Sequence, residues 1–502
     1  MKVGRRIRKK YINIEKGILS REMPVPAKRQ VRGKRYKNHL LNAIYAGMEP
    51  DYGKFVADKQ TLYDLGLLDD GKGKSSVFSI FNKTRWIGSR LKLECIFEMP
   101  LTDIKVLRER VEILKYLGQH PEFLDFGREQ LSFIEIYFSH SDSPRNFSRW
   151  MAIKKGIRNL LKPNNEYYVC RRGVEYLVLL LGSLDEFCRE SFSKQLPSKY
   201  RAYLERVMSL IDSKSLRKAL TVRKWGWVGT ARLDFYFRAF EREKIREILD
   251  ILYELDALRA VALTAVENEF TYPEYTEEEG IIDIKELYHP GVKSAVKNDA
   301  SVSRNRNICF LTGPNMAGKS TYMKAWGIAV YLAHIGFPVA ARSLKISIFK
   351  GLFSTINLSD NINLGYSFYY NEVLRVKQVA EEVVRLNQVV VIFDELFRGT
   401  NVKDAYDASY AVIAALAGLH KSVFVISTHI LEVTERLRTF DTIDFRYFEV
   451  VMQDGKPYYT YRLLPGVSLE RIGMYILNQE KVVETIQHAA ICNPSQATFP
   501  VK

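Results

Sequence analysis

The chain has 502 residues, of which 47% are hydrophobic, and this size and composition predict a folded protein with more than one domain. Its five cysteines are scattered without a C-x-x-C pair, which disfavours a disulfide framework, a zinc site or a redox motif. The net charge is +17. No apolar run is long enough to span a bilayer and the N-terminus shows no apolar signal segment, which favours a soluble, cytoplasmic protein with no membrane role.

Residues 1–57 are predicted to form a basic, partly disordered arm. Residues 1–37 contain fourteen Lys or Arg and two acidic residues, a net charge of +12 that leaves +5 for the rest of the chain. Such a segment can neutralise nucleic-acid phosphates in a salt-dependent way that is blind to sequence. A solvated tail and an Arg-rich organellar transit peptide are the alternatives.

The next part, residues 58–279, is predicted to be helical. Apolar residues recur there at helical spacing, as in residues 104–117, 174–184 and 246–270. We interpret these stripes as the packing seams of a long helical array rather than as a cofactor site. The acidic segment 276–280 marks the end of this part.

From residue 280 to residue 490 the pattern alternates between strands and helices, which is typical of a parallel sheet with helices on both faces. Strands are predicted at 308–312, 389–393 and 423–427, and helices at 320–335, 372–386 and 404–416. The predicted fold is therefore an all-α region followed by an α/β P-loop ATPase domain with an ABC-like parallel sheet. Residues 491–502 would be a tail.

The first predicted strand runs into a glycine-bounded loop that begins at Gly313. Its two glycines leave room for backbone N–H groups of the loop and of the next helix to point at a polyphosphate. Lys319 would reach the β- and γ-phosphates, and the Ser320 hydroxyl would ligate Mg²⁺. Such a match also occurs by chance, but a strand before it and a helix after it favour function. The predicted ATP-binding loop comprises Gly313, Pro314, Asn315, Met316, Ala317 and Gly318.

Asp394 and Glu395 end the second predicted strand, at the sheet edge where open α/β sheets bind ligands. Asp394 can hold Mg²⁺ through water opposite Ser320, and Glu395 can position and deprotonate the attacking water. His429 ends the third strand, where a neutral imidazole could contact the γ-phosphate or that water. A helix N-cap pair and a structural histidine are the alternatives. The three motifs in this order predict an ATP hydrolase.

Three segments, TGPNMAGKSTYMKAWGIAVYLAHIGFPVAA, DELFRGTN and STHILEV, closely resemble the MutS family of DNA mismatch-repair ATPases. Upstream, SIFNKTRWIGSRLKLECIFEMPLTDIKVLRERVEIL resembles the helical core of that family. The segment ELDALRAVALTAVENEFTYPEY resembles the helix that returns from its lever to the ATPase domain. The resemblance covers about residues 58–490 and implies a DNA-binding ATPase that uses ATP and Mg²⁺.

The resemblance also implies a role for each site residue. Phosphate or Mg²⁺ would be contacted by Asn315, Lys319, Ser320 and Thr321, metal and water by Asp394 and Glu395, and His429 would act as a switch. Ser367 falls where the family has a serine that reaches the γ-phosphate of the opposite subunit, and Glu372 matches the following acid. The resemblance therefore implies a homodimer with composite ATP sites, whose interface is stabilised by the segment that begins at Pro465. It also implies DNA and other repair proteins as partners, and a location at the nucleoid.

Some features depart from the family pattern. Ala295 replaces the aromatic residue that stacks on adenine, and the usual S-T-x-D-G after GT reads NVKDA, with Asn401, Val402 and Ala405. No room is expected before residue 58 for the mispair-reading Phe-x-Glu domains, and none between the helical core and the ATPase for a full DNA clamp. No nuclease tail is expected after residue 490. The protein is therefore expected either to recognise DNA shape, such as a branched or distorted duplex, or to depend on a partner or on its basic arm.

The sequence is compatible with two alternative functions. An ABC-type ATPase subunit that drives a non-DNA partner, such as a membrane transporter, would carry an LSGGQ-like signature between the phosphate loop and the Asp-Glu strand. The sequence GYSFYYNE occupies that interval instead. The other alternative, an ATP-binding scaffold with negligible turnover, is disfavoured by Glu395.

Overall fold

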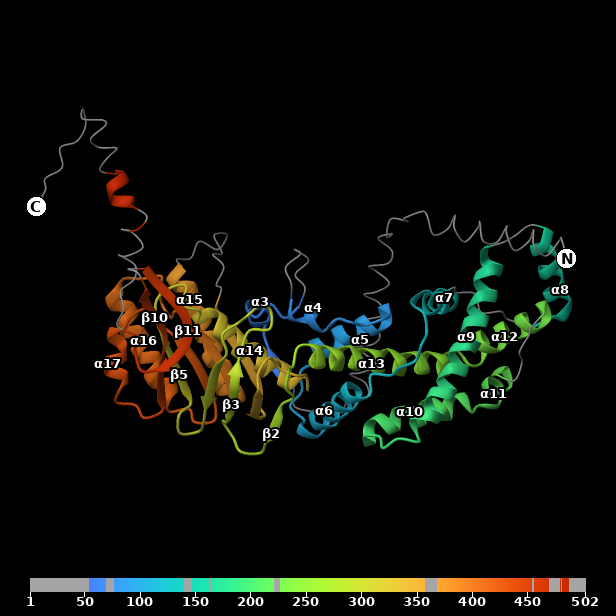
Figure 1. Cartoon of the computed structure of the whole chain (residues 1–502), viewed down its shortest axis with the longest axis horizontal. Helices are drawn as coiled ribbons and strands as arrows, with labels where there is room; N and C mark the ends of the chain where they lie inside the picture. The colour runs from blue at the N-terminus through green and yellow to red at the C-terminus, as the bar shows by residue number, and fades with distance from the viewer. Residues whose placement is uncertain are drawn as a thin grey trace, which may run out of the picture. The chain divides into compact units, whose positions relative to one another are not determined.

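A computed structural model describes residues 54–68, 76–139, 147–161, 165–220, 226–356, 368–453, 456–468, 479 and 481–486, all within one compact unit (Figure 1). Most of the predicted basic arm, Ser367 and most of the predicted bracing segment after Pro465 lie outside these residues. Among the described residues no helix is both long and apolar enough to cross a bilayer.

The first large region is helical, as predicted. Its helices are α4 (Val77–Phe81), α5 (Ile87–Glu98), α6 (Ile104–Gln119), α7 (Arg128–Ser139), α8 (Arg149–Leu161), α9 (Asn165–Ser191), α10 (Ser198–Ile211), α11 (Lys214–Leu220), α12 (Trp227–Ala239) and α13 (Arg242–Glu267). Helix α13 packs against α5 and α6, and α9 packs against α7 and α10. The predicted apolar stripes therefore serve as helix-packing seams.

The second region is built on a seven-stranded sheet in the order β1-β7-β8-β9-β5-β10-β11. Its strands are β1 (Val56–Ala57), β5 (Ile308–Thr312), β7 (Gly351–Thr355), β8 (Val389–Phe393), β9 (Val423–Ser427), β10 (Ile443–Gln453) and β11 (Lys456–Pro465). Neighbours from β1 to β10 are parallel, and β10 pairs with β11 antiparallel. Strands β5, β8 and β9 coincide with the three predicted strands.

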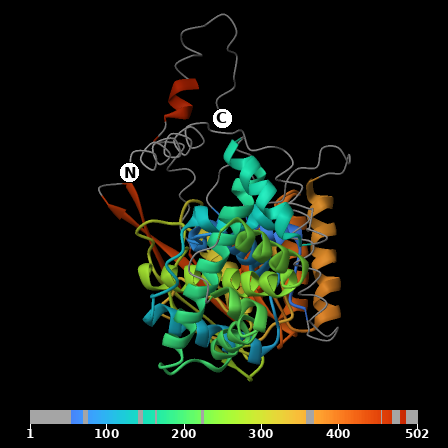
Figure 2. The same ribbon diagram turned by 90° about the vertical axis from the view of Figure 1, so that its right-hand side faces the viewer.

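Both faces of this sheet are covered, which explains why its central strands read as unbroken apolar runs. Cys309 and Leu311 face the core that contains α14 (Lys319–His334), whereas Ile308 and Phe310 face the core that contains α15 (Phe368–Leu386) and α16 (Val402–Ala417). The short helix α17 (Glu432–Leu437) belongs to the second core. Figure 2 shows α15, in orange, apart from the green helices of the helical region.

A smaller sheet has the strand order β2 (Glu274–Thr276), β6 (Ser343–Ser347), β3 (Ile282–Leu287) and β4 (Asn298–Val302). Strands β2, β3 and β4 lie between the two regions in the chain, and β6 follows α14 (Lys319–His334). Strand β4 leads into β5, and its Asn298 reaches the edge of the main sheet. The Asn298 Oδ1 atom accepts from the Leu463 N–H at 2.7 Å, and its Nδ2 donates to the Tyr461 carbonyl at 2.9 Å. One side chain therefore fixes the course of β11.

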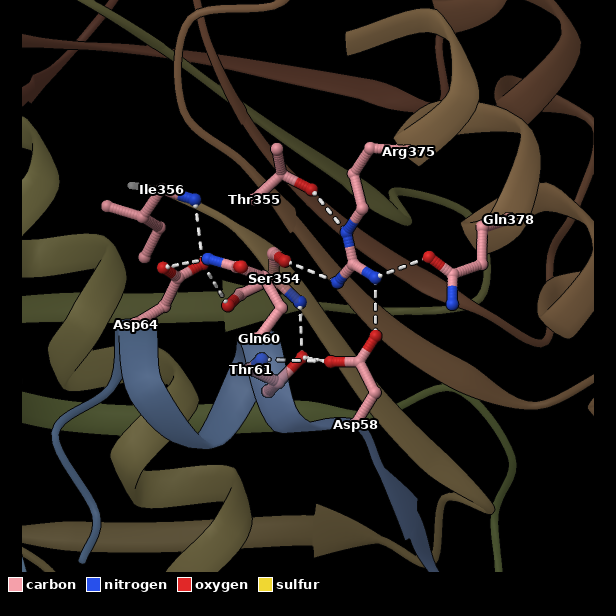
Figure 3. Close-up of polar contacts among 9 residues, drawn as sticks. All are labelled: Asp58, Gln60, Thr61, Asp64, Ser354, Thr355, Ile356, Arg375 and Gln378. Atoms are coloured by element: carbon pink, nitrogen blue, oxygen red, sulfur yellow. Dashed lines mark hydrogen bonds and ion pairs between the residues drawn. The ribbon is translucent and has the colours of Figure 1, made fainter. Parts of the chain in front are cut away.

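The structure differs from the sequence analysis at the boundary near residue 58. Strand β1 pairs with β7, and α3 (Lys59–Asp64) follows it, so this segment belongs to the main sheet rather than to the arm or the helical region. Thr61 Oγ1 accepts from the Ser354 N–H at 2.9 Å, and Asp64 Oδ2 accepts from the Ser354 hydroxyl at 2.8 Å (Figure 3). A two-residue strand is too short to give a periodic signal.

Arg375 of α15 completes this contact between α3 and β7. Its guanidinium pairs with Asp58 and donates to the Ser354 carbonyl at 2.7 Å (Figure 3). Burial would raise the pKa of Asp58, but the hydrogen bond and charge of Arg375 outweigh it and lower the pKa. The arginine and aspartate therefore remain an ion pair inside the fold.

Helix α14 links the helical region to the main sheet. Its terminal carbonyls lack partners within the helix and accept from outside it. Arg110 of α6 donates to the Ile335 carbonyl at 2.6 Å, and the Leu101 N–H donates to the His334 carbonyl at 2.6 Å. The helix that starts at the predicted phosphate loop is therefore held at its other end by the helical region.

Candidate active site

The glycine-bounded loop connects β5 to α14. Gly313 and Gly318 have φ angles of 134° and 101°, in the region that favours glycine, and Gly318 is the N-cap of α14. A Cβ at Gly313 would lie 3.5 Å from the Phe448 backbone nitrogen of β10. The loop therefore turns tightly beside β10 and delivers the N-terminus of a 16-residue helix, a site suited to an anion.

Lys319, the first residue of α14, lies beneath this loop and is only 4% exposed. Its Nζ atom donates to the Gly313 carbonyl at 2.7 Å and to the Pro314 carbonyl at 3.1 Å. Burial lowers the pKa of Lys319, and the carboxylates of Glu395 and Asp394 oppose this shift. A cation is thus held between the loop and two acidic side chains.

Asp394 lies directly after β8 and accepts hydrogen bonds on both carboxylate oxygens. Ser320 Oγ donates to Oδ2 at 2.5 Å, and Ser427 Oγ donates to Oδ1 at 2.5 Å. The structure therefore brings together the two residues predicted to hold Mg²⁺. A hydroxyl and one carboxylate are oxygen donors that suit Mg²⁺, which keeps several waters and uses substrate phosphates for its other ligands.

No cluster of three or more His, Cys, Asp or Glu side chains suited to a metal occurs among the described residues. A divalent ion at Ser320 and Asp394 would therefore depend on phosphate and water for the rest of its coordination. This dependence is the usual arrangement for Mg²⁺ in phosphate-transfer sites.

Glu395 and His429 form a pair at the ends of β8 and β9. The His429 Nε2 atom lies 2.5 Å from Glu395 Oε1, and Arg398 Nη1 lies 3.3 Å from Oε2. The hydrogen bond from His429 lowers the pKa of Glu395, although burial opposes it. The carboxylate is therefore ionised near neutral pH and can accept a proton from water.

Glu372 has a contact within its own chain that the sequence analysis did not foresee. Its carboxylate accepts from the Gly399 N–H at 3.1 Å and so holds the loop that follows Glu395. Burial raises the pKa of Glu372, and the N–H groups of Gly399 and Arg398 oppose this shift. Glu372 therefore helps to place Arg398, whose role had no signal in the sequence.

Tyr461 of β11 is a second unforeseen residue. Its ring lies 3.3 Å from the position that a Cβ would take at Gly318, and the residue is 46% exposed. It stacks on Tyr459 with a centroid distance of 6.4 Å and an interplanar angle of 28°. An aromatic face therefore stands beside the loop, although the position that is aromatic in the MutS family is Ala295 here.

The remaining predicted residues lie around the loop rim. Asn315, Met316 and Thr321 are exposed, Pro314 is half-buried and Ala317 is buried. Ser367 lies outside the described residues, and α15 begins at the next residue, Phe368. The described part of the site is therefore one edge of the sheet, where β5, β8 and β9 end.

Comparison with known proteins agrees with this geometry. Residues 309–494 match the family model described as MutS domain V. The chain is 30% identical over 241 residues to the DNA mismatch repair protein MutS of Anaplasma phagocytophilum (strain HZ), a match to 47% of this chain and 29% of that protein.

Two further proteins with the same description are similar to a comparable extent. That of Ehrlichia ruminantium (strain Gardel) is 30% identical over 237 residues, covering 47% of this chain and 29% of that protein. That of Lactococcus lactis subsp. cremoris (strain SK11) is 26% identical over 253 residues, covering 49% and 30%. The matched part of the chain thus spans less than a third of the length of these relatives.

Proposed function

The chain belongs to the MutS family, and from this premise we propose that it is a Mg²⁺-dependent ATP hydrolase that binds DNA. The main support for the proposal is that three sets of residues lie together at one edge of the sheet. These groups are the glycine loop with Lys319, the Ser320–Asp394 pair and the Glu395–His429 pair. Together they supply what phosphoryl transfer to water requires.

The proposed roles follow from the contacts. Backbone N–H groups of the loop and Lys319 bind the phosphates, and Ser320 and Asp394 hold Mg²⁺, which neutralises charge on the phosphate oxygens. Glu395 accepts the proton of the attacking water. His429 and Arg398 hold the Glu395 carboxylate in place from its two oxygens.

Tyr461 is proposed to stack on the nucleobase, because its exposed ring lies beside Gly318. Replacing Tyr461 with Ala is expected to weaken ATP binding about tenfold, since stacking of a base on an aromatic side chain contributes ~1–3 kcal/mol. Tyr461→Phe should bind as the wild type does. Titration with a fluorescent ATP analogue measures both, and inorganic tripolyphosphate, which has no base, should bind all three proteins alike. Unchanged ATP affinity in Tyr461→Ala would remove this role.

DNA binding is proposed from the relatives, which are named DNA mismatch repair proteins, and from the charge of helix α8. Helix α8 packs on α12 through Gly156, where Trp227 fills the space of a Cβ. Its basic residues Arg149, Lys154, Lys155 and Arg158 are all exposed, and the helix has no acidic residue. Such a surface suits a phosphate backbone.

Neutralising this helix should weaken DNA binding and its salt dependence. The variant Lys154→Gln, Lys155→Gln and Arg158→Gln is expected to lower the slope of log affinity against log salt by about 2–3 for duplex DNA. Arg171→Gln with Arg206→Gln, which removes two positive charges, is the control, because these arginines are already paired with Glu175 and Glu247. Equal slopes in both variants would argue against contact through α8. Removing residues 1–37 tests the predicted arm by the same measurement.

We further propose a homodimer in which Ser367 of one chain completes the ATP site of the other. Other repair proteins are the proposed partners, and the bacterial cytoplasm, at the nucleoid, is the proposed location. The same ATPase is expected to respond to DNA shape. ATP turnover should differ among homoduplex, mispaired, branched and single-stranded DNA, and a flat response to all four would favour an ATPase with a non-DNA partner.

A further inference from the structure

Ser427, the last residue of β9, contacts both acidic residues of the candidate site. It is fully buried, at 0% exposure. Its Oγ atom donates to Asp394 Oδ1 at 2.5 Å and accepts from the Glu395 N–H at 3.1 Å. A hydroxyl has one hydrogen and two lone pairs, so the single hydrogen of Ser427 is used on the carboxylate and one of its two lone pairs accepts from the amide.

These hydrogen bonds determine the orientation of the Asp394 carboxylate. With Ser427 on one oxygen and Ser320 on the other, the carboxylate is clamped between β9 and the first turn of α14. Both hydroxyls donate to it, so Asp394 acts as an acceptor on both sides and the lone pairs of Ser320 Oγ are left for a cation. The orientation of the proposed Mg²⁺ ligand therefore depends on a buried residue at the end of β9.

The same hydroxyl determines the backbone at Glu395. The φ angle there is 59°, a left-handed conformation that is unfavourable for a residue with a side chain. The Glu395 N–H is shared between the Ser427 hydroxyl, at 3.1 Å, and the Ser427 carbonyl, at 3.2 Å. This backbone conformation accompanies the contact of the Glu395 carboxylate with His429.

We propose that Ser427 is a positioning residue that couples the metal ligand Asp394 to the general base Glu395. This inference rests on the proposed ATPase function. The opposite view is that Ser427 only satisfies buried polar groups of the sheet. Ser422, just before the other end of β9, offers the comparison, because it is 2% exposed and its Oγ accepts from the Val389 N–H at 3.2 Å, at the start of β8.

The experiment compares Ser427→Ala, Ser427→Thr, Ser427→Cys and Ser422→Ala in the full-length chain. Removing the Ser427 hydroxyl is expected to lower kcat about tenfold or more and to raise the half-saturating Mg²⁺ concentration about tenfold, as loss of a hydrogen bond to a charged group predicts. Binding of a fluorescent ATP analogue in EDTA should stay within about twofold of the wild type. Ser427→Thr, which keeps the hydroxyl, should recover most of both losses, and Ser422→Ala should show neither.

The outcomes separate this inference from the proposed function. If Ser427→Ala lowers only the thermal midpoint, as Ser422→Ala also would, and Mg²⁺ dependence is unchanged, the inference is overturned. If Ser427→Ala does not fold, the same Mg²⁺ titration is made with Ser427→Cys, whose thiol has a similar volume but forms only weak hydrogen bonds. If the wild type binds nucleotide without hydrolysing it, the ATPase proposal fails, while Mg²⁺-dependent nucleotide binding still tests Ser427. If the wild type binds no nucleotide, both fail.

Discussion

Replacing Glu395 with Gln is expected to slow ATP hydrolysis by about 10²- to 10⁴-fold while leaving Mg²⁺-ATP bound. The amide has almost the shape of the carboxylate and keeps one acceptor oxygen for His429 or Arg398, but it cannot take a proton from water. Single-turnover release of phosphate measures the chemical step, and filter binding of ATP measures retention. The lowered pKa of wild-type Glu395 further predicts that acid inhibits turnover only below the ordinary range for glutamate.

A matched control for this variant is Glu432→Gln, because Glu432 is an exposed acid three residues after His429, in the first turn of α17. Its hydrolysis should equal that of the wild type. If Glu395→Gln turned over ATP at the wild-type rate, Glu395 would not be the proton acceptor, and the pairing with His429 would be structural.

Replacing Lys319 with Ala is expected to weaken ATP binding by about 100-fold or more, since hydrogen bonds to charged groups contribute ~1.5–3 kcal/mol each. The buried ammonium donates to two loop carbonyls and is attracted by the carboxylates of Glu395 and Asp394, so its loss removes a positive charge from the candidate phosphate site. Equilibrium titration with ATP in Mg²⁺ measures the loss.

Lys319→Ala also removes the ammonium that donates to the Gly313 carbonyl and to the Pro314 carbonyl, which keeps only the longer bond from the Ala317 N–H at 3.4 Å. A drop in the thermal midpoint is therefore expected with it. Lys324→Ala is the control, because Lys324 lies on the same helix but takes no part in the loop. Wild-type ATP affinity in Lys319→Ala would mean that the loop does not bind phosphate through this residue.

The core of the site could be predicted from sequence because its signals are local. Buried parallel strands read as continuous apolar runs, so β5, β8 and β9 could be located to the residue. Functional side chains at the ends of such strands gather at one sheet edge, which placed Asp394, Glu395 and His429 together before any contact was known. The spacing of the glycines likewise located the loop between β5 and α14, although it did not predict their φ angles.

What could not be predicted depends on contacts between residues far apart in the chain. Asp58 meets Arg375 across 317 positions, and no local pattern identifies either residue as a partner. Tyr461 reaches Gly318 only because β11 folds back on β10 and Asn298 fixes its course. In the sequence, Ser427 is one more small residue of an apolar strand, and only the structure shows that its hydroxyl donates to Asp394.

The link through α14 was likewise hidden in the sequence. Its first residue, Lys319, lies at the candidate phosphate site, and its last carbonyls are held by Arg110 and Leu101 of the helical region. Helix α14 therefore joins the proposed nucleotide site to the helical region, which contains the helix α8 that is proposed to meet DNA. This arrangement would connect the two proposed activities physically.

The decisive measurement is steady-state phosphate release from ATP by the purified wild-type chain, with Mg²⁺ and with EDTA, beside the Glu395→Gln variant. Turnover that requires Mg²⁺ and is lost in the variant is the expected result. No release with Mg²⁺, or the same release from both proteins, would contradict a hydrolytic site at the ends of β5, β8 and β9.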